Sequence, residues 1–189
     1  MENFRSPGAL AALLVSLCAG LGIDLWTKQI AFSQLVISVT MHPDGGIGLA
    51  ARPPVRFIEG FVHFEATVNQ GAVFGIGQGR RTLFVAVSLA AVVFLLWLFA
   101  HSGRQRFYQV ILGMLLAGVL GNLYDRLALG YVRDMIHMLF FGRDVFPWIF
   151  NVADVLLCTG VFLMLLHSVF SRPAHASAAT ATGGATPDG

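Results

Sequence analysis

Charge is scarce in this sequence, and that scarcity is the first guide to the class of protein. Only 12% of the 189 residues are Asp, Glu, Lys or Arg, 56% are hydrophobic, and the mean hydropathy is +0.73. A water-soluble domain needs more polar residues to cover its surface, so the composition predicts a membrane protein. The formal net charge is only +2 and no Lys/Arg-rich run occurs, which argues against a nucleic-acid partner.

Cysteine and the usual hydrolase motifs are lacking as well. The two cysteines, Cys18 and Cys158, lie in apolar runs without CxxC or His-flanked spacing, so we expect no disulfide framework, no metal site and two buried thiols. The chain has no HExxH motif of a metalloprotease and no GxSxG motif of a serine hydrolase. We therefore expect neither a metal nor another cofactor.

Long uncharged runs are what the sequence does have. Four of them approach the roughly 20 residues that cross a bilayer as a helix, and with polar ends included they predict spans at about 8–31, 82–100, 107–129 and 149–171. A cleaved signal peptide is the alternative for the first run, but its helical pattern continues through Asp24 and Lys28.

The interval between the first two spans is predicted to be β-rich over about 34–75. Val62–Asn69 alternates apolar and polar residues, which is typical of a half-buried strand, and Leu35–Met41 is rich in β-formers. The Gly/Pro-rich stretch 44–54 is predicted to be a loop, and 173–189 a disordered tail after a single domain, 1–172. The fold class is an all-α membrane protein with four transmembrane helices and a small β-rich cradle between helices 1 and 2.

Alternation of the spans places polar residues from separate helices at one membrane face. This is the face that carries the β-rich interval, and ionisable residues within a span are expensive and mark function. Lys and Arg counts on the two sides do not settle the orientation. The residues gathered in this way are Asp24, Lys28, Asn122, Asp125, Arg126, Asn151 and Asp154.

Spacing within this cluster predicts local partners. Asp24 and Lys28 are four apart and form an ion pair on one helix face. Gly113, Ala117 and Gly121 repeat every four residues, which lets a neighbouring helix approach closely. The adjacent Asp125 and Arg126 point in different directions, so Arg126 is either part of a structural network or a clamp on substrate.

Two carboxylates stand out as candidates for catalysis. Gly130 is predicted to end the third helix, and Asp134 then lies in an extended segment near the interface, where a surface acid is an alternative interpretation. Pro147 and Trp148 mark the entry of the fourth span, with Asp154 about five residues inside it. Two carboxylates that share a proton can activate water and polarise a carbonyl, although spacing alone does not establish this pair.

Four motifs in this order resemble the lipoprotein signal peptidases (signal peptidase II), a family of membrane aspartyl peptidases. They are Asp24-Leu-Trp-Thr-Lys28, Asn69-Gln-Gly-Ala-Val-Phe-Gly75, Gly121-Asn-Leu-Tyr-Asp-Arg126 with Gly130-Tyr-Val-Arg-Asp134, and Phe150-Asn-Val-Ala-Asp154. The resemblance implies catalytic Asp134 and Asp154, with Asp125 not catalytic. It implies substrate-binding or site-supporting roles for Asp24, Lys28, Asn69, Gly71, Asn122, Asp125, Arg126 and Asn151.

The same resemblance implies the biology. The enzyme is expected to remove the signal peptide of diacylglyceryl-modified prolipoproteins by cleaving before the lipidated cysteine. It is expected to be a monomer among membrane lipids in the bacterial cytoplasmic (inner) membrane, multi-pass, with cytoplasmic termini and with the cradle and active site at the outer face.

Two features depart from the family pattern, and one rival function stays open. Arg133 takes a place that is usually apolar, and a cation there lowers the pKa of Asp134 unless its side chain points away. The loop at 44–54 is longer than usual. The rival is a small proton-linked transporter or channel, since intramembrane charges also mark ion pathways, but the polar cluster is one-sided.

Overall fold

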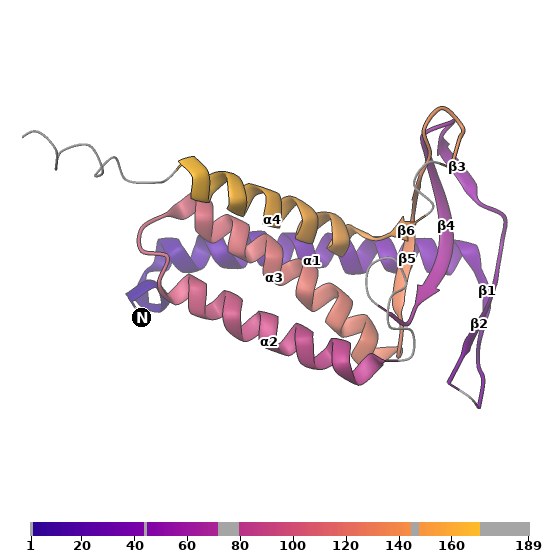
Figure 1. The fold of residues 1–189 in the computed structure, drawn as a ribbon, viewed down its shortest axis with the longest axis horizontal. Coiled ribbons are helices and arrows are strands. Elements are labelled where there is room, and N and C mark those ends of the chain that lie inside the picture. The colour runs from indigo at the N-terminus through magenta and orange to yellow at the C-terminus, as the bar shows by residue number, and fades with distance from the viewer. Residues whose placement is uncertain (1, 44, 72–79, 145–147, 171–189) are drawn as a thin grey trace, which may run out of the picture.

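Four long helices and two small antiparallel sheets at one end of them make up the fold of the described residues (Figure 1). The computed structural model describes residues 2–43, 45–71, 80–144 and 148–170. The helices are α1 (Pro7–Leu35), α2 (Arg81–Ala100), α3 (Arg106–Ala128) and α4 (Val152–Phe170), and each is long and apolar enough to cross a membrane. A short 3-10 helix, η1 (Glu2–Arg5), precedes α1. The predicted fold class is confirmed.

Helix α3 is the centre of the bundle. Of its most apolar window 61% is buried, against 22% for α1 and 11% each for α2 and α4. Small residues make this possible, because a Cβ on Gly113 would collide with Leu13 and Ser16 of α1, and one on Gly121 would collide with Asp24 of the same helix. The predicted close approach along this side of α3 is therefore confirmed.

The outer surfaces of the helices are apolar. Side chains such as Val93, Trp97 and Phe162 are more than half exposed, a pattern that suits contact with lipid rather than water. Cys18 and Cys158 are exposed as well, so the expectation of buried thiols was wrong. An apolar sequence shows only that a segment is excluded from water. In a membrane protein this holds for the lipid-facing surface as well as for the core.

Six strands lie beyond the helix ends on one side. They form a hairpin of β1 (Val36–Met41) and β2 (Ile47–Ala51), and an antiparallel sheet with the order β3-β4-β5-β6. The strands of that sheet are β3 (Val55–Ile58), β4 (Val62–Asn69), β5 (Val132–Met138) and β6 (Ile149–Phe150). The predicted strand Val62–Asn69 coincides with β4.

Three expectations about this region need correction. The stretch 44–54 contains β2, which pairs with β1 despite its glycines. The sheet also includes β5 and β6, so it is built from both interhelical connections on this side rather than from the first alone. Helix α4 begins at Val152 rather than at residue 149, because Ile149 and Phe150 pair with β5, and Asp154 therefore lies in the first turn.

The two ends of the bundle differ. The N-terminus and the end of α4 lie together at the end away from the sheet (Figure 1). The predicted tail, 173–189, and Pro147 lie outside the described residues, as does most of the second motif after Gly71. The sheet end positions the site, because β5 packs against α1 and α3 there and β4 packs against α1.

Candidate active site

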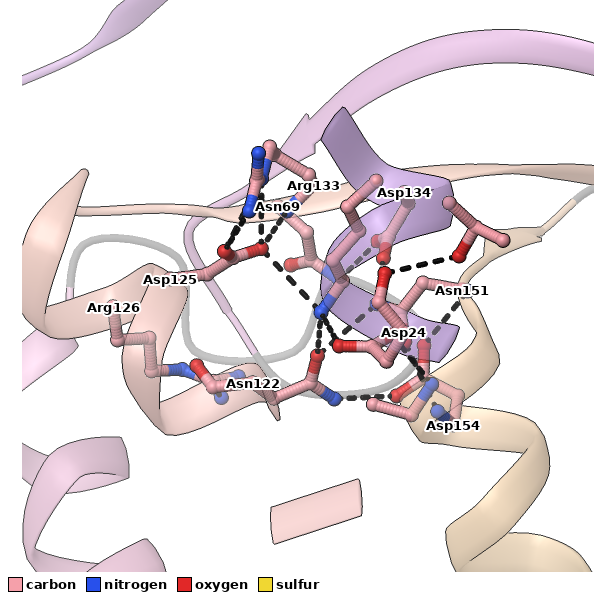
Figure 2. A network of polar contacts seen from close by, with 12 residues as sticks. Asp24, Asn69, Asn122, Asp125, Arg126, Arg133, Asp134, Asn151 and Asp154 are labelled. Atoms are coloured by element: carbon pink, nitrogen blue, oxygen red, sulfur yellow. Dashed lines mark hydrogen bonds and ion pairs between the residues drawn. The ribbon is translucent and has the colours of Figure 1, made fainter. Parts of the chain in front are cut away.

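Asp134 of strand β5 and Asp154 near the start of α4 both accept hydrogen bonds from Asn151 (Figure 2). Asn151 joins them, because its Nδ2 donates to Asp134 Oδ1 at 2.6 Å and its backbone N–H donates to Asp154 Oδ2 at 3.2 Å. Asn151 is fully buried and Asp134 is 2% exposed. The structure thus brings together the two predicted carboxylates from separate segments.

The start of α4 fixes the Asp154 side chain. Asp154 accepts a hydrogen bond from the Asn151 backbone, and its own N–H donates to Asn151 Oδ1 at 3.0 Å. This reciprocal pair is a capping box, which satisfies otherwise unpaired N–H groups at a helix start. One sequence feature therefore begins the helix and orients a carboxylate.

Strand register fixes the Asp134 side chain. Thr67 of β4 lies opposite Asp134, and a bulge between Phe64 and Thr67 sets this register. Two residues further along β4, Asn69 Nδ2 donates to Asp134 Oδ2 at 3.2 Å, and Asn69 Oδ1 accepts the N–H of Gly71 at 2.9 Å. Asn69 thus connects Asp134 to the chain that follows β4.

Arg126 reaches the same chain segment from α3. Its Nη2 donates to the carbonyl of Gly71 at 2.9 Å, and its guanidinium lies over the Phe84 ring of α2 at 5.4 Å. Of the two interpretations open from sequence, the network role is the one present here, although a side chain that already holds a backbone carbonyl has the chemistry to hold another.

Lys28 connects α1 to the carboxylate pair through Asn122. Lys28 Nζ lies 2.8 Å from Asp24 Oδ2 and donates to Asn122 Oδ1 at 2.9 Å, and both charged side chains are fully buried. Asn122 Nδ2 in turn donates to Asp154 Oδ1 at 2.8 Å. The predicted ion pair of Asp24 and Lys28 is confirmed, and Asp24 Oδ1 also accepts the N–H of Ala153 at 2.8 Å.

Asp125 turns away from the carboxylate pair. It is fully buried and binds Arg133, whose Nη2 lies 2.8 Å from Asp125 Oδ1. Arg133 and Asp134 are neighbours in β5 and leave the strand on opposite sides (Figure 2). The sequence analysis expected Arg133 to lower the pKa of Asp134 unless the Arg133 side chain points away from it. In the structure that side chain does point away.

A cavity of about 510 Å³ opens beside the two carboxylates. Helices α2, α3 and α4 line it with mostly apolar side chains, while Asp134, Asp154, Asn122 and Arg126 lie at its polar end. Sequence reasoning missed this mostly apolar wall, which includes Ser88, Ala91, Val119, Cys158 and Thr159. The one usable signal was helical spacing, since Cys158 lies four residues after Asp154 and therefore shares its helix face.

Comparison with known proteins decides the family. The sequence model of signal peptidase (SPase) II matches residues 16–170, which is most of the chain. The chain belongs to the signal peptidase II family.

Relatives and solved structures agree with this assignment. A lipoprotein signal peptidase of Anaeromyxobacter sp. (strain Fw109-5) is 34% identical and covers 95% of this chain and 93% of its own length. That of Aquifex aeolicus (strain VF5) is 30% identical over 92% and 95%. A bacterial membrane enzyme solved by the in meso method at 2.3 Å superposes with a TM-score of 0.68 at 28% identity, covering 85% of this chain and 89% of that one.

A signal peptidase II cleaves the signal peptides of prolipoproteins as an aspartic peptidase of the membrane, and this is the activity of the chain. The assignment decides against the proton-linked transporter. It also makes prolipoproteins the substrates and the protein multi-pass. Among the described residues, no group of three His, Cys, Asp or Glu side chains is placed to hold a metal ion.

Electrostatics at the carboxylate pair suit this peptidase chemistry. Burial, and after it the negative charge of Asp154, raises the pKa of Asp134 from 3.8 to about 7. Hydrogen bonds from Asn151 and Asn69 and the charge of Lys28 oppose the rise in this pKa. The Asp134 carboxyl group therefore changes between its protonated and ionised forms near neutral pH.

Proposed function

We propose that Asp134 and Asp154 are the catalytic pair of this signal peptidase II. The observation that carries the proposal is the bridge through Asn151, which holds one carboxylate from β5 and one from α4 at the polar end of an apolar cavity. Two carboxylates that one residue bridges in a largely buried site repel each other when both are ionised, and they therefore share one proton.

The shared proton gives the two groups different roles. Asp154, at the N-terminus of α4, takes a proton from water, while Asp134 carries the shared proton and donates it to the scissile carbonyl oxygen. Water oxygen bonds to the carbonyl carbon, which gives a neutral tetrahedral gem-diol. The C–N bond then breaks, the leaving nitrogen takes the proton from Asp154, and a gem-diol hydroxyl returns its proton to Asp134.

The surrounding residues support this geometry in separate ways. Asn69, Asn122 and Asn151 orient the carboxylates through hydrogen bonds. Arg126 holds Gly71 and is in position to take a substrate carbonyl in its place. Asp24, Lys28 and Asp125 form the buried charge network behind Asn122. We place all of these residues in one membrane-embedded domain, 1–172, that acts as a monomer among membrane lipids.

The cavity fits the substrate class. An apolar signal peptide can enter between α2 and α4 from the lipid, with its scissile bond at the polar end. A diacylglyceryl-modified cysteine just after the cut would then lie at the interface, beneath the sheet. In this arrangement the sheet and the active site face the outside of the bacterial inner membrane, and both termini lie in the cytoplasm.

Amide substitutions test the catalytic pair. Asp134→Asn and Asp154→Asn are each expected to lower the turnover of a lipidated prolipoprotein in detergent by at least roughly 10³-fold. Asp144→Asn is the control, because its side chain is 52% exposed and lies outside the cavity. Full activity in either of the first two variants would refute the pair, and inhibition by a chelator would contradict a metal-free mechanism.

Bulk in the cavity tests the binding mode. Cys158→Trp fills the cavity wall and is expected to raise KM, whereas Cys18→Trp places the same side chain on the exposed surface of α1 and leaves KM unchanged. Equal KM values for the two variants would show that the signal peptide binds elsewhere.

A further inference from the structure

Arg133 is the largest charged side chain next to the site that catalysis does not use. It lies in β5 directly before Asp134, and its side chain is only 9% exposed. A buried guanidinium is costly unless it is paired, and breaking a buried pair leaves an uncompensated charge. The partners of Arg133 therefore indicate what the side chain does.

Asp125 is that partner, and it holds both the side chain and the backbone of Arg133. Arg133 Nη2 and Nε donate to Asp125 Oδ1 at 2.8 Å and 3.1 Å, and the Arg133 backbone N–H donates to Asp125 Oδ2 at 3.0 Å. This planar, multidentate contact fixes direction as well as distance. It ties the start of β5 to the last turns of α3, one residue before Asp134.

Helix α1 completes the pocket of the guanidinium. Arg133 Nη1 donates to Gln29 Oε1 at 3.4 Å, and its Cζ lies 6.0 Å from the centre of the Phe32 ring. Arg133 thus contacts α1 and α3 from the strand, on the side of β5 opposite the carboxylate pair.

Asp125 is also within reach of Lys28. Lys28 Nζ lies 3.4 Å from Asp125 Oδ2 but only 2.9 Å from Asn122 Oδ1. Both oxygens of Asp125 accept from Arg133, and Lys28 makes its shorter contact with Asn122. Asn122 then keeps its Nδ2 toward Asp154 at 2.8 Å.

We infer that Arg133 is a positioning residue for the reaction, which acts by binding Asp125 so that β5 presents Asp134 and Lys28 stays on Asn122. The inference rests on the proposed roles of Asp134 and Asp154. Without Arg133, the buried carboxylate of Asp125 has Lys28 as its nearest cation and draws it away from Asn122. Both carboxylates of the pair then lose part of their orientation, one through β5 and one through Asn122.

Removal of the guanidinium is the first test. Arg133→Met is expected to lower kcat by roughly 10- to 100-fold with KM within about twofold, because displacement of catalytic groups lowers turnover while the binding cavity is untouched. Arg133→Lys keeps a cation without the multidentate contact and is expected to recover part of kcat. Arg56→Met is the matched control, since Arg56 pairs with Glu59 on the surface, where the two side chains are 71% and 84% exposed.

Pairwise neutralisation separates positioning from a loss of structure. Asp125→Asn alone leaves Arg133 buried and unpaired, whereas Arg133→Met with Asp125→Asn removes both charges and leaves Lys28 on Asn122. The double variant is expected to have a higher kcat than either single variant, measured per folded enzyme in detergent. If Arg133→Met does not fold, the kcat of Arg133→Lys and the kcat of the double variant test the positioning role in its place.

The outcomes distinguish this inference from the proposed function. Wild-type kcat in folded Arg133→Met, or a double variant no better than the worse single one, would overturn the positioning role. If Asp134→Asn and Asp154→Asn are inactive in the same assay, the catalytic pair stands in either case. If those two variants are active, it is the proposed catalytic pair that fails.

Discussion

The two ends of the bundle both bury polar side chains, and they differ in charge. At the end away from the sheet, Asn3, Ser102 and Gln109 are at most 6% exposed and bond one another and nearby carbonyls. At the sheet end the buried groups include Asp24, Lys28, Asp125 and Asp134. The buried side chains of the first cluster are uncharged and join η1, α2 and α3, with the partly buried Arg106 donating to Gln109 Oε1 at 2.8 Å, whereas the charged cluster borders a cavity.

The comparison teaches what distinguishes a site from a structural network. Burial and hydrogen bonding are common to both ends, so neither identifies catalysis. The sheet end adds a group that exchanges its proton near neutral pH, and it adds space beside that group. A titrating group and a cavity beside it together distinguish the active site from the structural network. The predictions below test this difference from the largest expected effect to the smallest.

Among the three predictions that compare the two ends, replacement of Asn122 by leucine is expected to have the largest effect. Asn122→Leu keeps the side-chain size but removes both the acceptor for Lys28 and the donor to Asp154. Turnover is expected to fall by about 10²-fold, because a displaced reacting group is that costly. Kinetics on a lipidated prolipoprotein measure it, and activity within twofold of wild type would show that this link does not orient Asp154.

Stability against pH tests the charge at the sheet end. Below about pH 4 Asp134 is protonated in both the folded and the unfolded protein. The stability that the protonated, buried Asp134 contributes to the folded state is lost as pH rises through its folded pKa of about 7. Asn cannot ionise, so the melting temperature of Asp134→Asn minus that of wild type should rise over this range and then level off. The change in unfolding free energy is at most about 1.4 kcal/mol per pH unit. A difference independent of pH would contradict the raised pKa.

Gln109→Leu at the other end is expected to have the smallest effect. It leaves Ser102 and Gly103 without the donor that now serves them, at a cost of about 1–3 kcal/mol of unfolding free energy. Turnover should stay unchanged at assay temperature, and the loss of stability should not depend on pH. A large loss of kcat in the folded variant would show that the two ends are coupled.

Much of this architecture follows from sequence, and the reasons are local. The spans follow from long uncharged runs, β4 from alternation, and the end of α3 from Gly130, which adopts a φ of 88° and donates to the Asp125 carbonyl. The ion pair of Asp24 and Lys28 follows from their spacing of four.

What sequence could not supply depends on partners distant along the chain. The strand β2 inside 44–54 and the late start of α4 are set by pairing with β1 and β5, which overrides glycine content and hydropathy. The choice of Arg133 as the partner of Asp125, and of Asn151 as the bridge between two carboxylates, needs the fold. The exposure of Cys18 and Cys158 depends on which helix faces meet lipid.

The pH dependence of wild-type kcat/KM tests the central claim most directly, because it reports the essential groups of the free enzyme. If Asp134 donates the shared proton, cleavage of a lipidated prolipoprotein falls tenfold per pH unit as the pH rises above about 7. Cleavage at a constant rate from about pH 6 to about pH 9, in enzyme shown to remain folded, would contradict a proton-sharing pair of Asp134 and Asp154.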